Sequence, residues 1–244
     1  MEKYIKNPNL PEEMVSAVLV DYRINKDSIK TLNSLGIRVY TTKSTDCLYE
    51  AISGHPDVIL HHIGDNKFIV SPENSKIFSK IPGIEIIVGK SQLNSKYPHD
   101  ISYNAARVGE FLIHNFKYTD EKILEHSEHL KKINVNQGYS KCSICVVSEN
   151  AIITSDIGIA KKCDLFGIDV LFVNDEDINL KGVSHGFFGG TTGKLSKNLL
   201  AVNGNIKYHK NHEEIITFLD KYNVKIIDLN LGFLEDIGTI IGLY

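Results

Sequence analysis

Apolar residues at helical spacing give way to short β-branched runs, and this order repeats along the chain. The stretches 27–42, 158–173 and 212–229 each begin with a helical pattern and close on a strand-like run. Between the two parts stands Gly36, Gly167 or Asn223, and these residues tolerate the left-handed conformation in which helices often end. Looser copies cover 120–137 and 74–89, where Pro82 shortens the second helix. The pattern predicts five helix–turn–strand units.

Strand-like stretches with polar or glycine-rich openings separate these units, and several of them are typical of two strands joined by a turn. The repeat length is roughly 40 to 50 residues, a period found in propellers and solenoids. The strand-like run 16–22 has no partner unless it joins the last repeat. We therefore expect an α/β fold in which five βαβ-type units form one ring, closed where the two ends of the chain meet. No Ser/Pro/Gly-rich linker divides the sequence, so we expect one domain over 1–244.

Composition narrows the class of protein. The chain has 244 residues, of which 42% are hydrophobic and 23% charged, as in an ordinary soluble domain. No apolar run approaches the ~20 residues that span a bilayer, and the N-terminus lacks the apolar core of a signal peptide, so we expect a cytoplasmic protein with no membrane partner. The net charge is -3 and arginine occurs at three positions, which argues against nucleic acid as a partner. The four cysteines should be free thiols.

Five repeats in a chain of this length resemble the pentein fold. The stretches "GYSKCSICVVSENAIITSD", "HGFFGGTTG" and "LEDIGTIIGL" look like an uncharacterised bacterial family assigned to that fold. The resemblance implies a five-bladed α/β propeller with pseudo-fivefold repeats around a central channel. Penteins include deiminases and amidinotransferases that modify guanidino groups, and also a non-enzyme, the initiation factor that prevents ribosomal subunits from joining.

One departure from the catalytic penteins concerns the nucleophile. Those enzymes place a nucleophilic cysteine near the C-terminus, and the segment 232–244 has none. Their cysteine mechanism therefore cannot be transferred to this chain as it stands. Their catalytic histidine precedes a glycine or aspartate motif, and His185 in "SHGFFGGTTG" has a comparable setting.

Cys142 and Cys145 form a C-x-x-C pair at the entrance to an apolar run. The residues that follow Cys142 indicate a strand, where positions three apart point to opposite faces. We therefore expect neither a metal knuckle nor a disulfide. Cys142 then stands alone at a strand mouth, with Lys141 beside it to lower the thiol pKa. Two interpretations stay open: a displaced nucleophile that works with His185 as base, and a small buried core residue.

Ligand contacts are predicted at polar residues and glycines near the strand mouths. A guanidinium group calls for carboxylates as bidentate acceptors, and the repeats align Asp100 with Asp236 around one channel. The full set of predicted ligand contacts is Asp100, Asn104, Arg107, Tyr139, Gly189, Gly190 and Asp236. For each residue the alternative is structural: a turn cap, a surface salt bridge, or a glycine that a tight turn requires.

Nucleotide and metal sites are not expected. "FGGTTGKL" has Phe188 where a P-loop needs its first glycine, and no helix follows it. His126 and His129 have helical spacing for a metal but no third ligand at a recognisable distance, so we expect no metal and no cofactor. Two functional hypotheses remain. One is a channel site for a guanidino or amino-acid-like small molecule, with hydrolase or amidinotransferase chemistry. The other is a non-catalytic interaction protein. The oligomeric state is left open.

Overall fold

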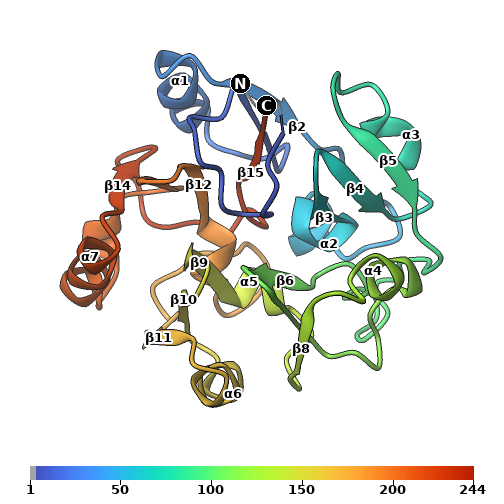
Figure 1. Ribbon diagram of the computed structural model, residues 1–244. Coiled ribbons are helices and arrows are strands. Elements are labelled where there is room, and N and C mark those ends of the chain that lie inside the picture. Colours follow the sequence, from blue (N-terminus) through green and yellow to red (C-terminus); the bar gives the residue numbers. More distant parts are fainter. Residues whose placement is uncertain (1–3) are drawn as a thin grey trace.

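The computed structural model describes residues 4–244, which form a ring of five small sheets (Figure 1). Each sheet has three strands, in the orders β15-β1-β2, β3-β4-β5, β6-β7-β8, β9-β10-β11 and β12-β13-β14. The strands are β1 Ala17–Val20, β2 Arg38–Thr41, β3 Leu60–Gly64, β4 Lys67–Val70, β5 Glu85–Val88, β6 Ala106–Val108, β7 Phe111–His114, β8 Lys131–Asn134, β9 Ile144–Ser148, β10 Ala151–Thr154, β11 Asp169–Phe172, β12 Thr192–Ser196, β13 Leu199–Val202, β14 Lys225–Asp228 and β15 Ile241–Leu243. The predicted α/β propeller of five βαβ-type units is confirmed.

All five units share one connectivity. The first strand pairs antiparallel with the middle strand, and the middle strand pairs parallel with the third. A helix links the middle strand to the third, as a parallel pair requires. These linking helices lie on the outside of the ring and are α1 Lys26–Ser34, α3 Ser75–Phe78, α4 Glu121–His126, α6 Ile157–Leu165 and α7 His212–Lys221 (Figure 1).

The helix ends lie where the sequence predicts them. Asn25 caps α1 by accepting a hydrogen bond from the Asp27 amide. Three residues after helices have positive φ angles, 78° at Gly36, 77° at Gly167 and 55° at Asn223. Glycine and asparagine adopt this conformation at low cost, so each helix ends there and the chain turns into its strand.

The ring closes by pairing its first strand with its last. Ala17 of β1 lies opposite Leu243 of β15, in antiparallel register. The predicted partner of the run 16–22 is therefore confirmed, and β15 lies beside the first strand of the chain (Figure 1). Closure by this pairing gives β1 a partner on both sides, so it is not left as an edge strand.

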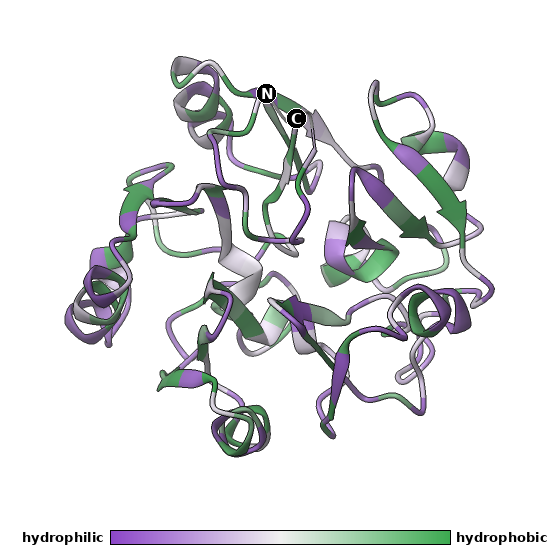
Figure 2. Ribbon diagram, viewed as in Figure 1, coloured by the Kyte–Doolittle hydropathy of each residue, from purple (hydrophilic) through white to green (hydrophobic). Residues whose placement is uncertain are grey.

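Apolar side chains fill the spaces between neighbouring units. One cluster packs β1 and α1 against β12 and β13, and a second packs β9 and β10 against β13 and α7. Figure 2 shows the apolar residues concentrated on the strands, while the outer helices carry many polar ones. Burial of one large aliphatic side chain contributes about 1.5–3 kcal/mol, so these clusters between neighbouring blades help to hold the ring together.

The segment that precedes β1 lies against the middle of the ring. Its backbone bonds to two different blades, through Ile5 O to Asp65 N at 2.9 Å and Val15 N to Leu195 O at 2.8 Å. Beneath it lies a cavity of about 20 Å³ lined by residues that include Asn9, Lys141 and Thr239. Among residues 4–244, no helix is long and apolar enough to cross a membrane.

Candidate functional site

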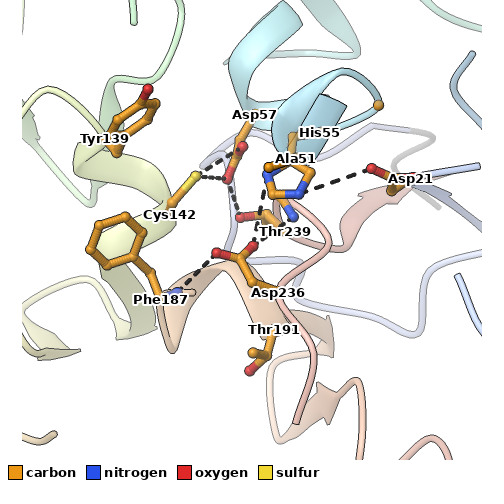
Figure 3. A network of polar contacts seen from close by, with 12 residues as sticks. Asp21, Ala51, His55, Asp57, Tyr139, Cys142, Phe187, Thr191, Asp236 and Thr239 are labelled. Atoms are coloured by element: carbon orange, nitrogen blue, oxygen red, sulfur yellow. Dashed lines mark hydrogen bonds and ion pairs between the residues drawn. The ribbon is translucent and has the colours of Figure 1, made fainter. Parts of the chain in front are cut away.

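Five turns, one from each blade, meet at the centre of the ring. Each turn directly precedes the first strand of its sheet. They contribute Asp57 from α2 (Pro56–Ile59), Asn104 before β6, Cys142 from α5 (Ser140–Ser143), Gly189 from η2 (Gly189–Thr191) and Thr239 before β15. Hydrogen bonds join all five residues into one network, part of which Figure 3 shows.

Cys142 lies in a helical turn and not in a strand, which corrects the expectation from its sequence. The turn α5 ends at Ser143 and β9 begins at Ile144, so of the C-x-x-C pair only Cys145 lies in the strand. Both thiols are free, as expected. Cys142 Sγ lies 3.2 Å from Asp57 Oδ1 and 3.1 Å from Asp57 Oδ2, and Asn104 Nδ2 donates to the sulfur at 3.2 Å.

The environment of Cys142 favours the neutral thiol. Cys142 is 2% exposed. Burial raises the pKa of its thiol well above the usual value, and the negative charges of Asp57 and Asp236 raise it further. Asn104 acts in the opposite direction because its amide donates to the sulfur. The sequence predicted that the adjacent Lys141 would lower the pKa of the Cys142 thiol, but burial and the nearby carboxylates raise it instead. The thiol is therefore protonated at neutral pH.

Thr239 connects Asp57 to a buried lysine. Its hydroxyl donates to Asp57 Oδ2 at 2.8 Å and accepts from Lys141 Nζ at 3.0 Å. Thr239 has a φ of 75°, a conformation that is costly for a β-branched residue. This backbone strain lies at the centre of the ring, where the turns of the five blades meet. Burial lowers the pKa of Lys141, while the charges of Asp57 and other nearby acids raise it.

His55 lies beside this network without a hydrogen bond of its own. Within residues 4–244 neither of its buried ring nitrogens has a hydrogen-bond partner. Nδ1 faces Asp236 Oδ1 at 3.8 Å, and Nε2 faces Asp21 Oδ2 at 4.0 Å (Figure 3). One ligand atom each of His55, Asp57 and Cys142 lies within 4.8 Å of the others. A nucleophile, an imidazole and a carboxylate thus share one buried place.

Half-buried aromatic residues form the side of the centre near Cys142. Tyr139 donates from its hydroxyl to Asp100 Oδ2 at 2.5 Å, and the hydroxyls of Tyr139 and Tyr49 lie 3.3 Å apart. The rings of Tyr139 and Phe187 are 6.3 Å apart between centroids. The second oxygen of Asp100 is buried and, within the described residues, has no hydrogen-bond partner. Burial raises the pKa of Asp100. We call Tyr49, Asp100, Tyr139 and Phe187 the aromatic mouth.

Asp236 and two glycines complete the floor of the site. The Asp236 carboxylate accepts from the Phe187 amide at 2.9 Å and the Gly238 amide at 2.9 Å, and burial raises its pKa. A methyl group on Gly190 would overlap this carboxylate, and one on Gly189 would overlap the backbone of the Cys142 turn. Glycine is therefore required here for close packing of the turns. Whether either glycine also contacts a ligand stays a prediction.

His185 and Arg107 lie apart from the network, whereas the other predicted residues border it. His185 is exposed, donates from Nδ1 to Gly186 O at 3.0 Å, and lines a groove of about 260 Å³ with Phe187. Within the described residues the hydrogen-bond partners of the Cys142 thiol are Asp57 and Asn104, not His185. Arg107 is half-buried and donates to the backbone oxygens of Ile63 and Gly109. Whether Arg107 contacts a ligand stays a prediction.

Four polar residues of this centre were not predicted from the sequence: His55, Asp57, Thr239 and Tyr49. A usable signal was present in "HPD" at 55–57, directly before the strand "LHHIG". Asp57 stands before its strand as Asn104 and Cys142 stand before theirs, so alignment of the five turns would have found it.

Solved structures of guanidino-modifying enzymes share this fold. An amidinotransferase of saxitoxin biosynthesis from Microseira wollei superposes with a TM-score of 0.58 and 14% identity, over 95% of this chain and 92% of that one. The inosamine-phosphate amidinotransferase from Streptomyces griseus gives 0.61 and 11%, over 100% and 97%. An agmatine deiminase from C. jejuni gives 0.55 and 12%, over 93% and 90%.

Sequence comparison gives a narrower assignment. No curated protein matches the chain at a significant level. The model of a family of unknown function, DUF6873, matches residues 19–241, which reach into all five blades and include every residue of the central network. The protein is thus a pentein-fold member of the DUF6873 family.

Proposed function

We propose that the chain binds a small guanidino compound at the aromatic mouth and that Cys142 attacks the central carbon of its guanidinium group. The observation that carries the proposal is the buried cluster of Cys142, His55 and Asp57 within 4.8 Å. This is the arrangement that cysteine-dependent transferases and hydrolases need: a thiol, a base near it, and a carboxylate that orients one of them.

The charge of the site supports a cationic ligand. Asp21, Asp57, Asp100 and Asp236 are all buried around the centre. The positive groups near them are Arg23, which pairs with Asp21, and Lys141. A planar cation that enters between Tyr139 and Phe187 would meet aromatic faces and the unpaired oxygen of Asp100.

The same charge explains how a protonated thiol becomes a nucleophile. A guanidinium group beside Cys142 would offset the carboxylate charges that hold the thiol pKa high, so the thiol can lose its proton when the ligand arrives. His55 would take that proton, and the resulting imidazolium would lie between Asp21 and Asp236. Without a ligand the thiol stays protonated and reacts slowly, which protects it from other electrophiles.

The proposed reaction balances without a cofactor. The sulfur bonds to the guanidino carbon, one carbon–nitrogen bond breaks, and the departing amine takes the proton from His55. Water then releases the carbon group as a ureido product, or an acceptor amine takes it as an amidino group. Fold neighbours are named for both outcomes, as deiminase and as amidinotransferase, and the site geometry favours neither.

The test combines binding, turnover and mass. Purified protein is incubated with agmatine or L-arginine, with and without an acceptor amine, and products are followed together with the mass of the intact chain. We expect a product and, on quenching, a covalent adduct on Cys142. The Cys142→Ser variant should lose activity by about 10³-fold or more. The matched control Cys145→Ser changes a neighbouring buried thiol outside the network and should retain activity.

Two results would overturn parts of the proposal. Equal turnover by the Cys142→Ser variant would remove the nucleophile but leave the ligand class. Absence of calorimetric binding for every guanidino compound tested would remove the ligand class itself.

A further inference from the structure

We propose that His55, Asp57 and Cys142 also form a binding site for one zinc ion. The three residues come from two blades, since His55 and Asp57 flank the start of α2 and Cys142 lies in α5. One nitrogen, one oxygen and one sulfur lie within 4.8 Å of one another. This goes beyond the proposed reaction, and it departs from the sequence-based expectation of no metal.

The spacing is close to what a tetrahedral ion requires. Zinc binds sulfur at about 2.3 Å and nitrogen or oxygen at about 2.0–2.2 Å, so its ligand atoms lie roughly 3.3–3.7 Å apart. Cys142 Sγ already lies 3.1 Å and 3.2 Å from the Asp57 oxygens. The imidazole needs a shift of at most about an ångström to close the set.

The unpaired imidazole is an independent sign of a ligand. A buried polar atom without a partner costs free energy, and within the described residues both ring nitrogens of His55 are in that state. With one nitrogen on the metal, the other would still face a carboxylate, Asp236 on the Nδ1 side or Asp21 on the Nε2 side. A carboxylate behind a metal-bound histidine fixes its tautomer and orientation, and this is the usual second-shell arrangement.

The remaining contacts hold the other two ligands in place. Asp57 Oδ2 accepts from the Thr239 hydroxyl, which leaves Oδ1 for the ion. Asn104 Nδ2 donates to the Cys142 sulfur and would continue to stabilise it as a thiolate. On binding, the S–H proton leaves to solvent and a sulfur–zinc bond replaces it, so one proton is released for each ion.

Ligand chemistry selects the kind of ion. A thiolate and an imidazole favour zinc-class ions, whereas magnesium and calcium prefer sites made of oxygen alone. Three protein ligands leave a fourth position for water. The ion would occupy the sulfur and the imidazole together, so zinc would inhibit the reaction, a consequence that rests on the proposed function.

The experiment uses cobalt as a spectroscopic substitute for zinc. Reduced, chelator-treated full-length protein is titrated with Co²⁺ while absorbance is recorded. We expect a thiolate-to-cobalt band in the near ultraviolet and tetrahedral bands in the visible, both saturating at one ion per chain and both lost when Zn²⁺ is added. The Cys142→Ser variant should lose the thiolate band, and His55→Gln should raise the Kd at least about tenfold.

Controls separate the cluster from other residues. Cys145→Ser and His185→Gln change a buried thiol and an exposed imidazole outside the cluster, and both should keep the band. A thiolate band that survives in Cys142→Ser, or no band at millimolar Co²⁺, would overturn the inference. If circular dichroism shows that Cys142→Ser is unfolded, alkylation of the wild-type chain decides: Zn²⁺ must slow labelling of Cys142, and unchanged labelling counts against the site.

The metal and the reaction can fail separately. Cobalt absorbance requires no substrate, so a band in a protein that acts on no guanidino compound supports the metal site and removes the reaction. Turnover of a guanidino compound without any cobalt absorbance band would support the reaction and remove the metal site.

Discussion

The thiol of Cys142 and the carboxylate of Asp57 lie in direct contact, with the sulfur 3.1 Å and 3.2 Å from the two oxygens. They belong to different blades, 85 positions apart in the sequence, and each lies in a turn before the first strand of its sheet. The contact links the ionisation of the one group to the charge of the other.

The Asp57→Asn variant should make the thiol more reactive. Burial and the Asp57 charge both raise the thiol pKa, and the substitution removes the charge while the site stays buried. Below the thiol pKa, the rate of alkylation by iodoacetamide should rise about tenfold for each unit by which the pKa falls. The Asp156→Asn variant is the control, because Asp156 caps α6 and asparagine is an equally good cap. An unchanged rate at Cys142 would mean that burial alone sets its reactivity.

The Gly190→Ala variant should disturb the floor of the site. The added methyl group overlaps the Asp236 carboxylate, which must move and weaken its bonds to the Phe187 and Gly238 amides. We expect a loss of about 1–3 kcal/mol in the free energy of unfolding, measured by urea denaturation. Gly158→Ala in α6 is the matched control and should change stability by less than about 1 kcal/mol, since alanine favours helix and the added methyl group meets only the Asp156 side-chain oxygen, at 3.0 Å. Equal stability of the two variants would contradict the packing described for Gly190.

Asp175 should make stability fall as pH rises from about 4 to 6. Its side chain is buried and accepts from Ser155 and from the Phe188 amide, and burial raises its pKa to about 6. A folded-state pKa above the unfolded value stabilises the fold at low pH, and this contribution disappears as pH passes the folded value. The Asp175→Asn variant has no carboxyl group to ionise at this position. Its free energy of unfolding should therefore rise relative to that of the wild type by up to about 3 kcal/mol between pH 4 and pH 7.

The comparison between the two proteins isolates Asp175 from other titrating groups. Urea denaturation of both at pH 4, 5, 6 and 7 gives the difference directly. A difference that stays constant over this range would show that Asp175 ionises with an ordinary pKa.

Leu243 should contribute to stability through ring closure. It is 3% exposed and lies opposite Ala17, where β15 pairs with β1. The Leu243→Ala variant should lose about 2–5 kcal/mol of the free energy of unfolding. Leu231→Ala, at a residue that is 84% exposed, should change it by less than about 0.5 kcal/mol. Similar losses in the free energy of unfolding for both variants would show that pairing of β15 with β1 contributes little to stability.

The repeats could be found in the sequence because each carries its own local signal. The helical spacing before Gly36, Gly167 and Asn223 and the β-branched run after it are set by neighbouring residues. Closure between 16–22 and the last repeat followed from counting strands that lacked a partner.

The site was harder to predict because it depends on contacts between blades. Asp100, Asn104, Tyr139, Cys142 and Asp236 all border the centre, and whether they contact a ligand stays a prediction. His55 was missed because nothing local distinguishes a histidine that faces the centre from one that packs in the core. His185 was selected for its glycine-rich neighbourhood, and those glycines are instead explained by the close approach of Asp236 and the Cys142 turn. Its catalytic role stays a prediction, as does the alternative of a non-catalytic interaction protein.

The pairing of β1 with β15 also affects how the protein can be made. β1 is synthesised early, yet its antiparallel partner is β15, which begins at Ile241. Until the ribosome has delivered that strand, β1 presents one unpaired edge, and such edges pair readily with other chains. The nascent chain is therefore exposed to aggregation until β15 has been made, and a chaperone that shields β1 during translation would raise the yield of folded protein.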